Sequence, residues 1–531
     1  MKFLISICLV CFLHVLPSNR AVTAADPVTA DVVLKNGLIV DGTGNAPFRG
    51  SVALKGERIV GVGDFEVEQV DLEIDCLGLV IAPGFIDLHN HSDRQVVDRK
   101  TRAVVNYLLQ GCTTIVTGNC GSGPTDVGEY YRKIDASGTG TNVAHLLPQG
   151  ALRERVIGNL RRSATAEELQ QMKEITAQAM RDGAWGMSTG LIYVPSSYAD
   201  TEELTAIASV VAEHAGFYAS HIRGEGTGVL SSVDEALRIG RGAKLPVHIS
   251  HFKSSGRDAW GLVREAARMI KKAREQGETV TADQYPYVAS STSLGATLLP
   301  AAARAGGRAG LLKRLDDPVQ RATIIAEIEQ ALPNRDGGAA IRIARYAPRQ
   351  DWVGKTLTDI ASRERKTVVL IALEIFRNGN ASVVNFSMSE DDVRSIMQLP
   401  WVATASDGRA YLPGADKPHP RSYGTFARKI GHYALDQKVL SLEAAVRSSS
   451  GLPADILRLG DRGYLKVGHF ADVVAFRKNG FIDRATFDDP HQYSKGAVHV
   501  FVNGEAAVSR STPTGALAGR ALRHESGKTG E

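Results

Sequence analysis

Between residues 103 and 287 the chain alternates between helix-forming segments and short apolar strands. Strands are expected at 113–119, 186–192, 217–222, 246–252 and 279–287, and each follows a segment with the apolar spacing of a helix. Repeated helix–strand units with apolar strands are typical of a buried parallel sheet in an α/β fold. The repeat therefore predicts a (β/α)8 barrel or a doubly wound sheet.

Metal-binding residue types stand at the carboxyl ends of these strands. His89 and His91 are two residues apart in "GFIDLHNHSD", so on a strand both rings point to the same face. The other candidates are Cys120, His221, His251 and Asp407, each of which closes a predicted strand. In a (β/α)8 barrel such strand ends meet at the face that carries the active site.

Each of these residues alone has a simpler explanation. A pair like His89 and His91 occurs by chance, a buried cysteine such as Cys120 is most often a small apolar residue, and an Asp before Gly, as at Asp407, often only forms a turn. Core packing does not explain why so many strands deliver such residues to one mouth. We therefore predict a metal site.

Zinc suits this set of ligands. His89 and His91 are expected to hold one ion and His221 and His251 another, with the Cys120 thiolate able to bridge the two. Bound zinc makes water acidic enough to attack at neutral pH. A carboxylate beside it, Asp407, can take the remaining proton and pass it to the leaving nitrogen of an amide. The chemistry predicted is metal-assisted hydrolysis.

Short β-branched runs separated by turns occupy both ends of the chain. They predict one small β-sandwich built from residues 26–82 and 456–510, around a barrel at 83–455. The Arg- and Gly-rich stretch at about 301–350 is expected to be an insertion. The polar residues 511–531 are expected to form a flexible tail.

The first 25 residues have a basic start, an apolar run and small residues at Ala24 and Ala25, which predicts a cleaved signal peptide and an exported, periplasmic or secreted protein. The run is short for a membrane span, so no stable membrane insertion is expected, although an uncleaved anchor is an alternative. The 62 basic and 58 acidic residues nearly balance, which predicts no nucleic-acid partner. Oligomeric state does not follow from the sequence.

Five cysteines are present, and two of them, Cys8 and Cys11, fall in the predicted signal. Cys76, Cys112 and Cys120 remain, an odd number that cannot form a full set of disulfides. At least one thiol is left over, and a cysteine held by a metal suits an oxidising compartment.

Several motifs occur in an order that resembles the N-acyl-D-amino-acid deacylase (D-aminoacylase) group of the amidohydrolase superfamily. They include "APGFIDLHNHSD", "GCTTIVTGNCG", "ASHIRGEG", "HISHFKSSG", "DQYPYVASSTSL", "ATASDG" and "PHPRSYGTF". The resemblance covers residues 31–476. It implies a metal-dependent (β/α)8 barrel with a small β-sandwich, which hydrolyses N-acyl-D-amino acids.

The resemblance also implies roles for individual residues. Cys120, His221 and His251 correspond to a tight zinc site, His89 and His91 to a more exposed and weaker one, and Asp407 to the catalytic acid/base. Four further residues correspond to substrate-binding positions. Lys253, Tyr285 and Arg421 would hold the α-carboxylate of this small-molecule substrate, and Tyr193 would line the pocket. From the residues alone, the two cations could equally be solvated loop charges and the tyrosines packing residues.

The identity of the amino acid is less constrained. Residues 290–303 contain no Lys or Arg, and Leu294, Leu298 and Leu299 are apolar, which predicts neutral, apolar substrate side chains. Arg304 and Arg308 would favour an acidic side chain, D-glutamate or D-aspartate, if the insertion folds over the mouth. Cyclic-amide hydrolysis, as in dihydroorotases or hydantoinases, dipeptide hydrolysis and a non-catalytic binding protein are the other interpretations.

Overall fold

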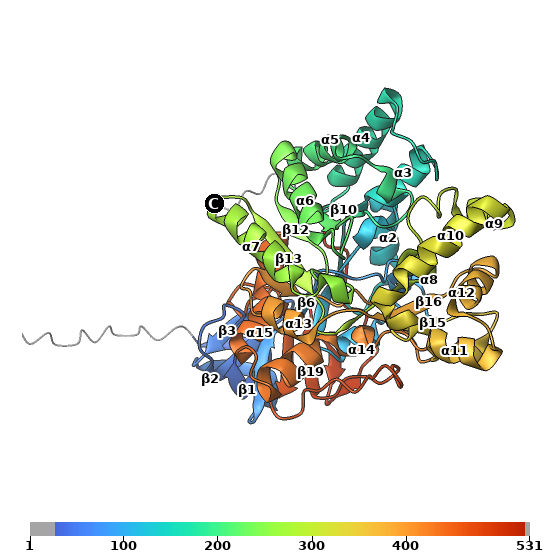
Figure 1. Ribbon diagram of the computed structural model, residues 1–531. Coiled ribbons are helices and arrows are strands. Elements are labelled where there is room, and N and C mark those ends of the chain that lie inside the picture. The colour runs from blue at the N-terminus through green and yellow to red at the C-terminus, as the bar shows by residue number, and fades with distance from the viewer. Residues whose placement is uncertain (1–26, 526–531) are drawn as a thin grey trace, which may run out of the picture.

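The middle of the chain forms a barrel of parallel strands (Figure 1). Residues 27–525 are described by a computed structural model, which contains two parallel sheets, β6-β7-β8 and β17-β13-β12-β11-β10-β9. One residue separates β8 from β9, and a bridge between Asn90 and Gly408 joins the ends of β6 and β17. The strands are β6 (Phe85–Asp87), β7 (Cys112–Thr117), β8 (Asn142–His145), β9 (Leu147–Pro148), β10 (Gly186–Gly190), β11 (Phe217–His221), β12 (Val247–Ile249), β13 (Val280–Gln284) and β17 (Val402–Thr404). The predicted barrel is confirmed.

Helices alternate with the strands and cover the outside of the barrel. Their apolar faces pack on the strands, and side chains cap the first turns of α2, α4, α5 and α15. Thr165 and Glu168, for example, form a reciprocal capping box at the start of α4. The helices are α1 (Val105–Leu108), α2 (Val127–Ser137), α3 (Gln149–Val156), α4 (Ala166–Arg181), α5 (Thr201–Glu213), α6 (Val229–Ala243), α7 (Leu262–Glu275), α13 (Glu390–Met397), α14 (Arg421–Ala427), α15 (Leu442–Ser449) and α16 (Gly451–Leu457).

Both ends of the chain contribute to one β-domain, in which the blue and red strands of Figure 1 lie together. Its strands form a single nine-stranded sheet, within which β1 pairs with β4 through Lys35 and then with β5 from Leu38. This change of partner next to a register shift folds one continuous sheet around an apolar core. The strands are β1 (Val28–Ile39), β2 (Phe48–Lys55), β3 (Arg58–Gly63), β4 (Val67–Asp75), β5 (Leu79–Pro83), β18 (Val473–Arg477), β19 (Ala497–Val502), β20 (Glu505–Ser509) and β21 (Thr512–Pro513).

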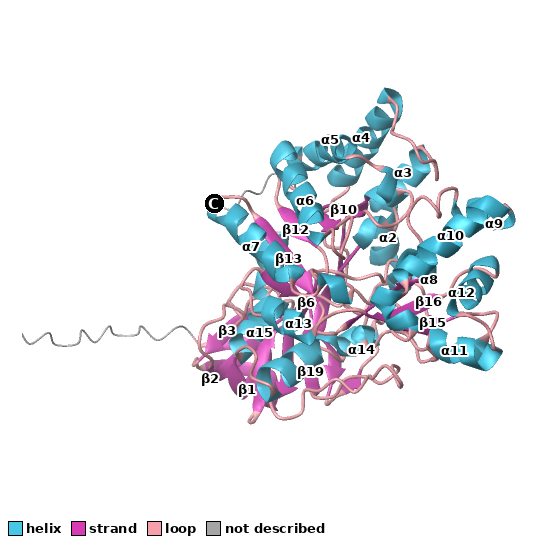
Figure 2. Cartoon of the chain, viewed as in Figure 1, coloured by secondary structure: helices cyan, strands magenta, loops and turns pink. Residues whose placement is uncertain are grey.

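The insertion is larger than the predicted 301–350. It extends from β14 to β16 and has its own antiparallel sheet and its own apolar core, beside the barrel (Figure 2). The prediction was too short because β14 and β16, which pair with each other, lie on either side of the Arg- and Gly-rich stretch. The elements are β14 (Ala289–Ser293), α8 (Leu294–Leu298), α9 (Gly307–Asp316), α10 (Pro318–Ala331), β15 (Ile341–Arg345), α11 (Leu357–Glu364), α12 (Val368–Arg377) and β16 (Ser382–Phe386).

The prediction of a flexible tail from residue 511 is wrong for the part that the structure describes. Ala518 and Ala521 form bridges with Thr139 and Val143 at the edge of β8, and the Trp185 indole donates to the Leu522 carbonyl at 2.7 Å. Small residues allow this close approach. The predicted signal at 1–25 and the last residues, 526–531, lie outside the described range. Within 27–525, no helix has the length and apolar character needed to cross a bilayer.

Candidate metal centre and active site

Side chains with metal-binding atoms meet at the carboxyl end of the barrel strands. Cys120 Sγ lies 3.2 Å from His89 Nε2, 3.5 Å from His221 Nδ1 and 3.6 Å from His251 Nε2. All four residues are buried, whereas His91 is partly exposed. Two donor sets have atoms within 4.8 Å of one another and share the cysteine: His89, His91 and Cys120, and Cys120, His221 and His251. The structure thus brings the five predicted ligands together.

Three residues of the centre turn sharply out of their strands. Cys120, His251 and Asp407 have φ values of 53°, 36° and 50°, in the left-handed region that non-glycine residues rarely adopt. Such a conformation costs on the order of 1–3 kcal/mol and persists only where neighbours hold it. The Asn119 amide does so for Cys120, donating to the carbonyls of Leu88 and Val116. The turns aim the side chains across the barrel mouth.

Two carboxylates that the sequence analysis missed orient the histidines: Asp283, which is buried, and Glu225, which is partly buried. Asp283 lies 3.4 Å from His89 Nδ1 and accepts from the His251 backbone N–H at 2.6 Å. Glu225 lies 3.0 Å from His251 Nδ1. A carboxylate on the outer nitrogen fixes a ring so that its other nitrogen faces the ion. Asp283 is the last residue but one of β13, but it falls in the middle of the predicted strand 279–287, and Glu225 lies in a glycine-rich loop, so neither carried a strand-end signal.

Another buried carboxylate, Asp87, ties the histidine strand to the strand of Asp407. It accepts hydrogen bonds from the Ser406 N–H at 2.8 Å, the Ser406 hydroxyl at 2.5 Å and the Asn90 amide at 2.8 Å. Burial raises the pKa of Asp87 to about 6, against the lowering effect of these bonds. The residue precedes His89 by two positions and fixes β6 against the end of β17.

The chemistry of the donors fits zinc. Burial alone would raise the pKa of the Cys120 thiol, but the positive charges of His89 and His221 outweigh it and hold that pKa well below its usual value. A thiolate and imidazole nitrogens are ligands that zinc takes in proteins. The short separation of His221 Nδ1 and His251 Nε2, 2.8 Å, brings two such nitrogens to one point beside the sulfur.

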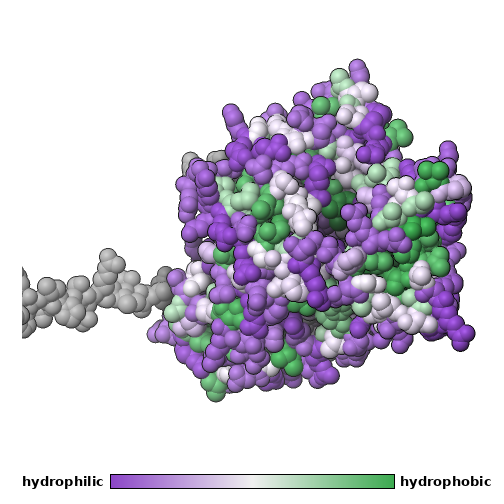
Figure 3. Space-filling view, in the orientation of Figure 1, coloured by the Kyte–Doolittle hydropathy of each residue, from purple (hydrophilic) through white to green (hydrophobic). Residues whose placement is uncertain are grey.

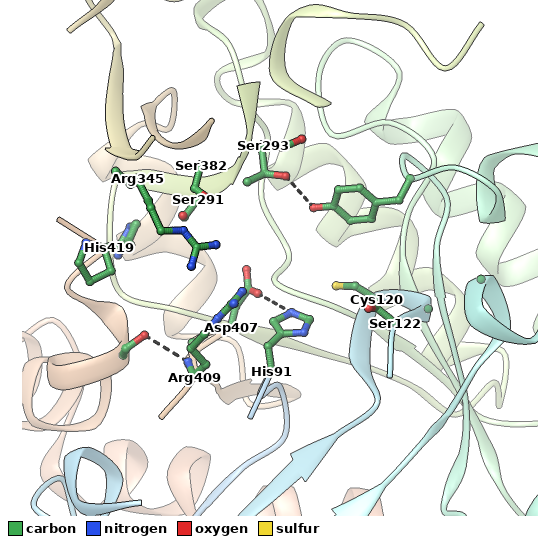
Figure 4. A pocket seen from close by; sticks show the side chains of 18 of the residues that line it. His91, Cys120, Ser122, Ser291, Ser293, Arg345, Ser382, Asp407, Arg409 and His419 are labelled. Carbon is green, nitrogen blue, oxygen red and sulfur yellow. Dashed lines mark hydrogen bonds and ion pairs between the residues drawn. The ribbon is translucent and has the colours of Figure 1, made fainter. Parts of the chain in front are cut away.

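Asp407 lies against the exposed side of this centre (Figure 4). Its Oδ1 is 3.1 Å from His91 Nε2 and 3.6 Å from His89 Nε2, and its Oδ2 forms an ion pair with Arg421 at 2.7 Å. Burial raises the pKa of Asp407, but Arg421 and His89 outweigh it and hold the pKa well below its ordinary value. The carboxylate is ionised at neutral pH, with one oxygen held and the other directed to the histidines.

The four predicted substrate-binding residues surround the same centre in two layers. Arg421 and Tyr193 line the main cavity, while Lys253 and Tyr285 lie behind it beside His251. The Lys253 ammonium pairs with Glu225 at 2.5 Å, and the Tyr285 ring lies 4.8 Å from the Arg421 guanidinium. The Tyr285 hydroxyl is buried and has no hydrogen-bond partner among the described residues.

A cavity of about 400 Å³ opens above the centre. Its inner wall consists of barrel residues, among them His91, Cys120 and Asp407, and its outer wall includes Ser291, Ser293, Arg345 and Ser382 of the insertion (Figure 4). Tyr193 spans the two walls, since its hydroxyl lies 3.1 Å from Thr292 Oγ1. The surrounding surface is mostly hydrophilic, with apolar side chains gathered over the insertion (Figure 3).

The structure does not support the argument for an apolar substrate side chain, which required the leucines of residues 290–303 to line the cavity. Leu294, Leu298 and Leu299 are buried in the core of the insertion and do not line the cavity. Their apolar character serves packing. Arg304 and Arg308 do not line it either, because their guanidinium groups donate to the carbonyls of residues 192 and 377.

Comparison with known proteins gives consistent matches. The model of the Amidohydrolase family matches residues 72–508. The chain is 33% identical to the D-aminoacylase of Alcaligenes xylosoxydans xylosoxydans and 34% identical to the N-acyl-D-glutamate deacylase of that organism, in both cases over 94% of this chain and 98% of the relative. A crystal structure of N-acyl-D-glutamate deacylase from Bordetella bronchiseptica, complexed with zinc and a phosphonate inhibitor, superposes with a TM-score of 0.81 at 32% identity, covering 93% of this chain and 100% of that one.

Proposed function

This chain belongs to the amidohydrolase family, and on that premise we propose that it is a zinc-dependent hydrolase that releases a D-amino acid and a carboxylate from N-acyl-D-amino acids. The observation that carries the proposal is Cys120, which is shared by two histidine pairs and faces Asp407 in one cavity. Relatives that align over nearly their whole length are named D-aminoacylase and N-acyl-D-glutamate deacylase.

Cys120, His221 and His251 would hold the tighter zinc ion, because all three are buried and Glu225 orients His251. His89 and His91 would hold a second, weaker ion with Cys120, since His91 is partly exposed. When bound, zinc polarises the scissile carbonyl and acidifies water. Proton transfer and substrate binding are carried out by side chains.

Asp407 moves the proton. Its ionised Oδ1 accepts a proton from the attacking water and delivers it to the amide nitrogen, which leaves as an amine. Arg421 holds Oδ2, so that the carboxylate keeps one orientation during the transfer. The low pKa of Asp407 leaves it unprotonated, and able to act as this base, throughout the neutral range.

The substrate's α-carboxylate would bind between the two layers of cations. Arg421 offers a planar fork that fits a carboxylate, and Lys253 and the free Tyr285 hydroxyl add donors from behind. Burial raises the pKa of Tyr285 to about 12, so the hydroxyl keeps its proton. Anchoring the carboxylate while the acyl carbonyl lies at the metal centre fixes two of the four groups on Cα, so that the two enantiomers direct their side chains differently.

The test uses purified zinc-loaded protein, with chelator-treated protein as its control. Release of free amino acid is measured from N-acetyl-D-leucine, N-acetyl-L-leucine, N-acetyl-D-glutamate and a D-dipeptide, and ring opening of dihydroorotate is followed by its ultraviolet absorbance. Chelator-sensitive release from the acetylated D-compounds and not from N-acetyl-L-leucine is expected. Faster turnover of the dipeptide or the cyclic amide would contradict the proposal, and metal binding without any turnover would indicate a binding protein.

Export is part of the same proposal and rests on residues 1–25. N-terminal sequencing of protein from a bacterial host that recognises the signal should find a start near Asp26. A start at Met1 in the membrane fraction would indicate an uncleaved anchor instead.

A further inference from the structure

Two arginines line the outer part of the active-site cavity. Arg345 is the last residue of β15, in the insertion, and Arg409 follows Asp407 by two positions. Figure 4 shows the Arg345 side chain extending from the insertion into the cavity, on the side of Asp407. Arg345 is exposed and Arg409 is half-buried. The two come from separate elements and line the same cavity.

Neither guanidinium has a carboxylate partner anywhere in residues 27–525. The Arg409 guanidinium lies 5.9 Å from the Tyr411 ring, and the Arg345 guanidinium makes no hydrogen bond or ion pair within that range. The cations of the inner layers differ, since Arg421 is paired with Asp407 and Lys253 with Glu225. Two unpaired guanidinium groups on one cavity are suited to an anion.

The other charges of the cavity do not neutralise these arginines. Asp416 lies 3.1 Å from His491 Nε2, and Glu154 accepts from the Asn159 amide at 3.2 Å. Neither carboxylate forms an ion pair with an arginine of the cavity. The hydroxyl groups of the insertion wall, at Ser291, Ser293 and Ser382, supply further donors beside Arg345.

We propose that Arg345 and Arg409 form a subsite for a second carboxylate of the substrate, in addition to its α-carboxylate. The inference rests on the proposed function, which assigns the α-carboxylate to Arg421, Lys253 and Tyr285. A second carboxylate can come from the amino-acid side chain, as in N-acyl-D-glutamate, or from the acyl group, as in an N-succinyl-D-amino acid. Both present the same group to the same guanidinium pair.

The first experiment compares acids with their neutral isosteres on zinc-loaded protein. The pairs are N-acetyl-D-glutamate with N-acetyl-D-glutamine, and N-succinyl-D-alanine with N-succinamoyl-D-alanine. A kcat/KM at least about tenfold higher for the acid is expected in one pair, because charge-assisted hydrogen bonds are lost with the amide. The pair that responds identifies the source of the carboxylate. A ratio of one or less in both pairs would overturn the subsite.

Substitutions then assign the effect to the two arginines. Arg345→Met and Arg409→Met should each lower kcat/KM for the preferred acid about tenfold to a hundredfold and leave its isostere unchanged. Arg321→Met is the matched control, because Arg321 lies on α10 in the insertion, forms no ion pair among the described residues and does not line the cavity. Equal losses on acid and isostere would mean that the arginines only support the structure.

Failure of the proposed function would look different. If the zinc-loaded protein hydrolysed neither these four compounds nor N-acetyl-D-leucine, the assigned reaction would be removed. In that case the affinities of the acids and their isosteres, measured by calorimetry, test the subsite without turnover. Tighter binding of an acid than of its isostere, with the difference lost in Arg345→Met, would support the subsite. Equal binding of acid and isostere would overturn it.

Discussion

The two walls of the active-site cavity differ in the burial and the pairing of their charged side chains. The inner wall belongs to the barrel, where Cys120 and Asp407 are buried and each has a charged partner or a ligand neighbour; Lys253, behind this wall, is likewise buried and paired. The outer wall includes the insertion, where Arg345 is exposed and unpaired among the described residues. A buried charge requires a fixed partner, whereas an exposed charge is solvated by water and stays available to bind a ligand. The buried metal centre therefore suits chemistry, and the outer part of the cavity, with Arg345 of the insertion and Arg409, suits selection.

Separate cores make this division possible. The insertion has its own cluster of buried apolar residues, distinct from the barrel core. Changes in one core need not disturb the other, so the outer wall can vary while the metal centre is kept. The substitutions below probe each wall in order of decreasing effect on catalysis.

The largest loss is expected from Cys120→Ala. Removing the sulfur shared by both donor sets should abolish tight zinc binding and lower kcat/KM by more than about a thousandfold, since a metal supplies several kcal/mol of transition-state stabilisation. Metal content by mass spectrometry and the deacylation rate measure it. The control is Cys112→Ala, a buried cysteine outside the donor sets, which should keep its zinc. Full zinc content in Cys120→Ala would remove the cysteine from the site.

Asp407→Asn should lower kcat about a hundredfold to ten-thousandfold and leave zinc content unchanged, because it removes the proton acceptor and no predicted ligand. Steady-state rates and metal analysis of the same preparation separate the two effects. Asp416→Asn, another acid of the cavity, should retain activity. Equal activity of Asp407→Asn and the parent protein would exclude Asp407 from the mechanism.

Glu225→Gln should weaken zinc binding about tenfold to a hundredfold, the usual effect of losing a carboxylate that orients a metal-binding histidine. Competition with a chromogenic chelator measures the affinity. Glu154→Gln changes a cavity carboxylate that is not near a ligand, and its zinc affinity should match that of the parent. An unchanged affinity in Glu225→Gln would show that the His251 ring needs no such partner.

Leu298→Ala should have the smallest effect on catalysis and a large one on folding. The side chain is buried in the insertion core, so its removal should cost about 2–5 kcal/mol of stability in that unit while the preference between acid and isostere stays the same. Denaturant unfolding and the kcat/KM ratio test this, with the exposed Val319→Ala as control. A changed ratio would mean that Leu298 shapes the pocket after all.

The same contrast explains what the sequence revealed. Alternating helices and strands predicted a (β/α)8 barrel or a doubly wound sheet, and the family resemblance selected the barrel. Because strand ends meet at one mouth of a barrel, residues as distant as His89 and Asp407 could be assigned to one site. Glu225 escaped notice because a loop gives no periodic signal. Asp283 escaped notice because β13 ends at Gln284, three residues earlier than the predicted strand, so Asp283 fell inside that strand and not at its end.

The insertion resisted prediction for another reason. An apolar run such as Leu294 to Leu299 looks the same whether it lines a pocket or fills a core, and only tertiary packing decides. Arg345 lies far from Asp407 in sequence and on no repeated unit of the barrel, so nothing marked it as a cavity residue. The C-terminal residues were misjudged because small polar segments can pair with a sheet edge as Ala518 and Ala521 do.

The most direct test of the account is an anomalous-scattering map, recorded at the zinc edge from crystals of the zinc-loaded protein. We expect a peak bonded to Cys120 Sγ at about 2.3 Å and to nitrogens of His221 and His251 at about 2.0–2.1 Å. A second, weaker peak is expected beside His89 and His91. Zinc bound elsewhere, or at these histidines without the cysteine, would contradict the shared thiolate on which the assignment of the inner wall depends.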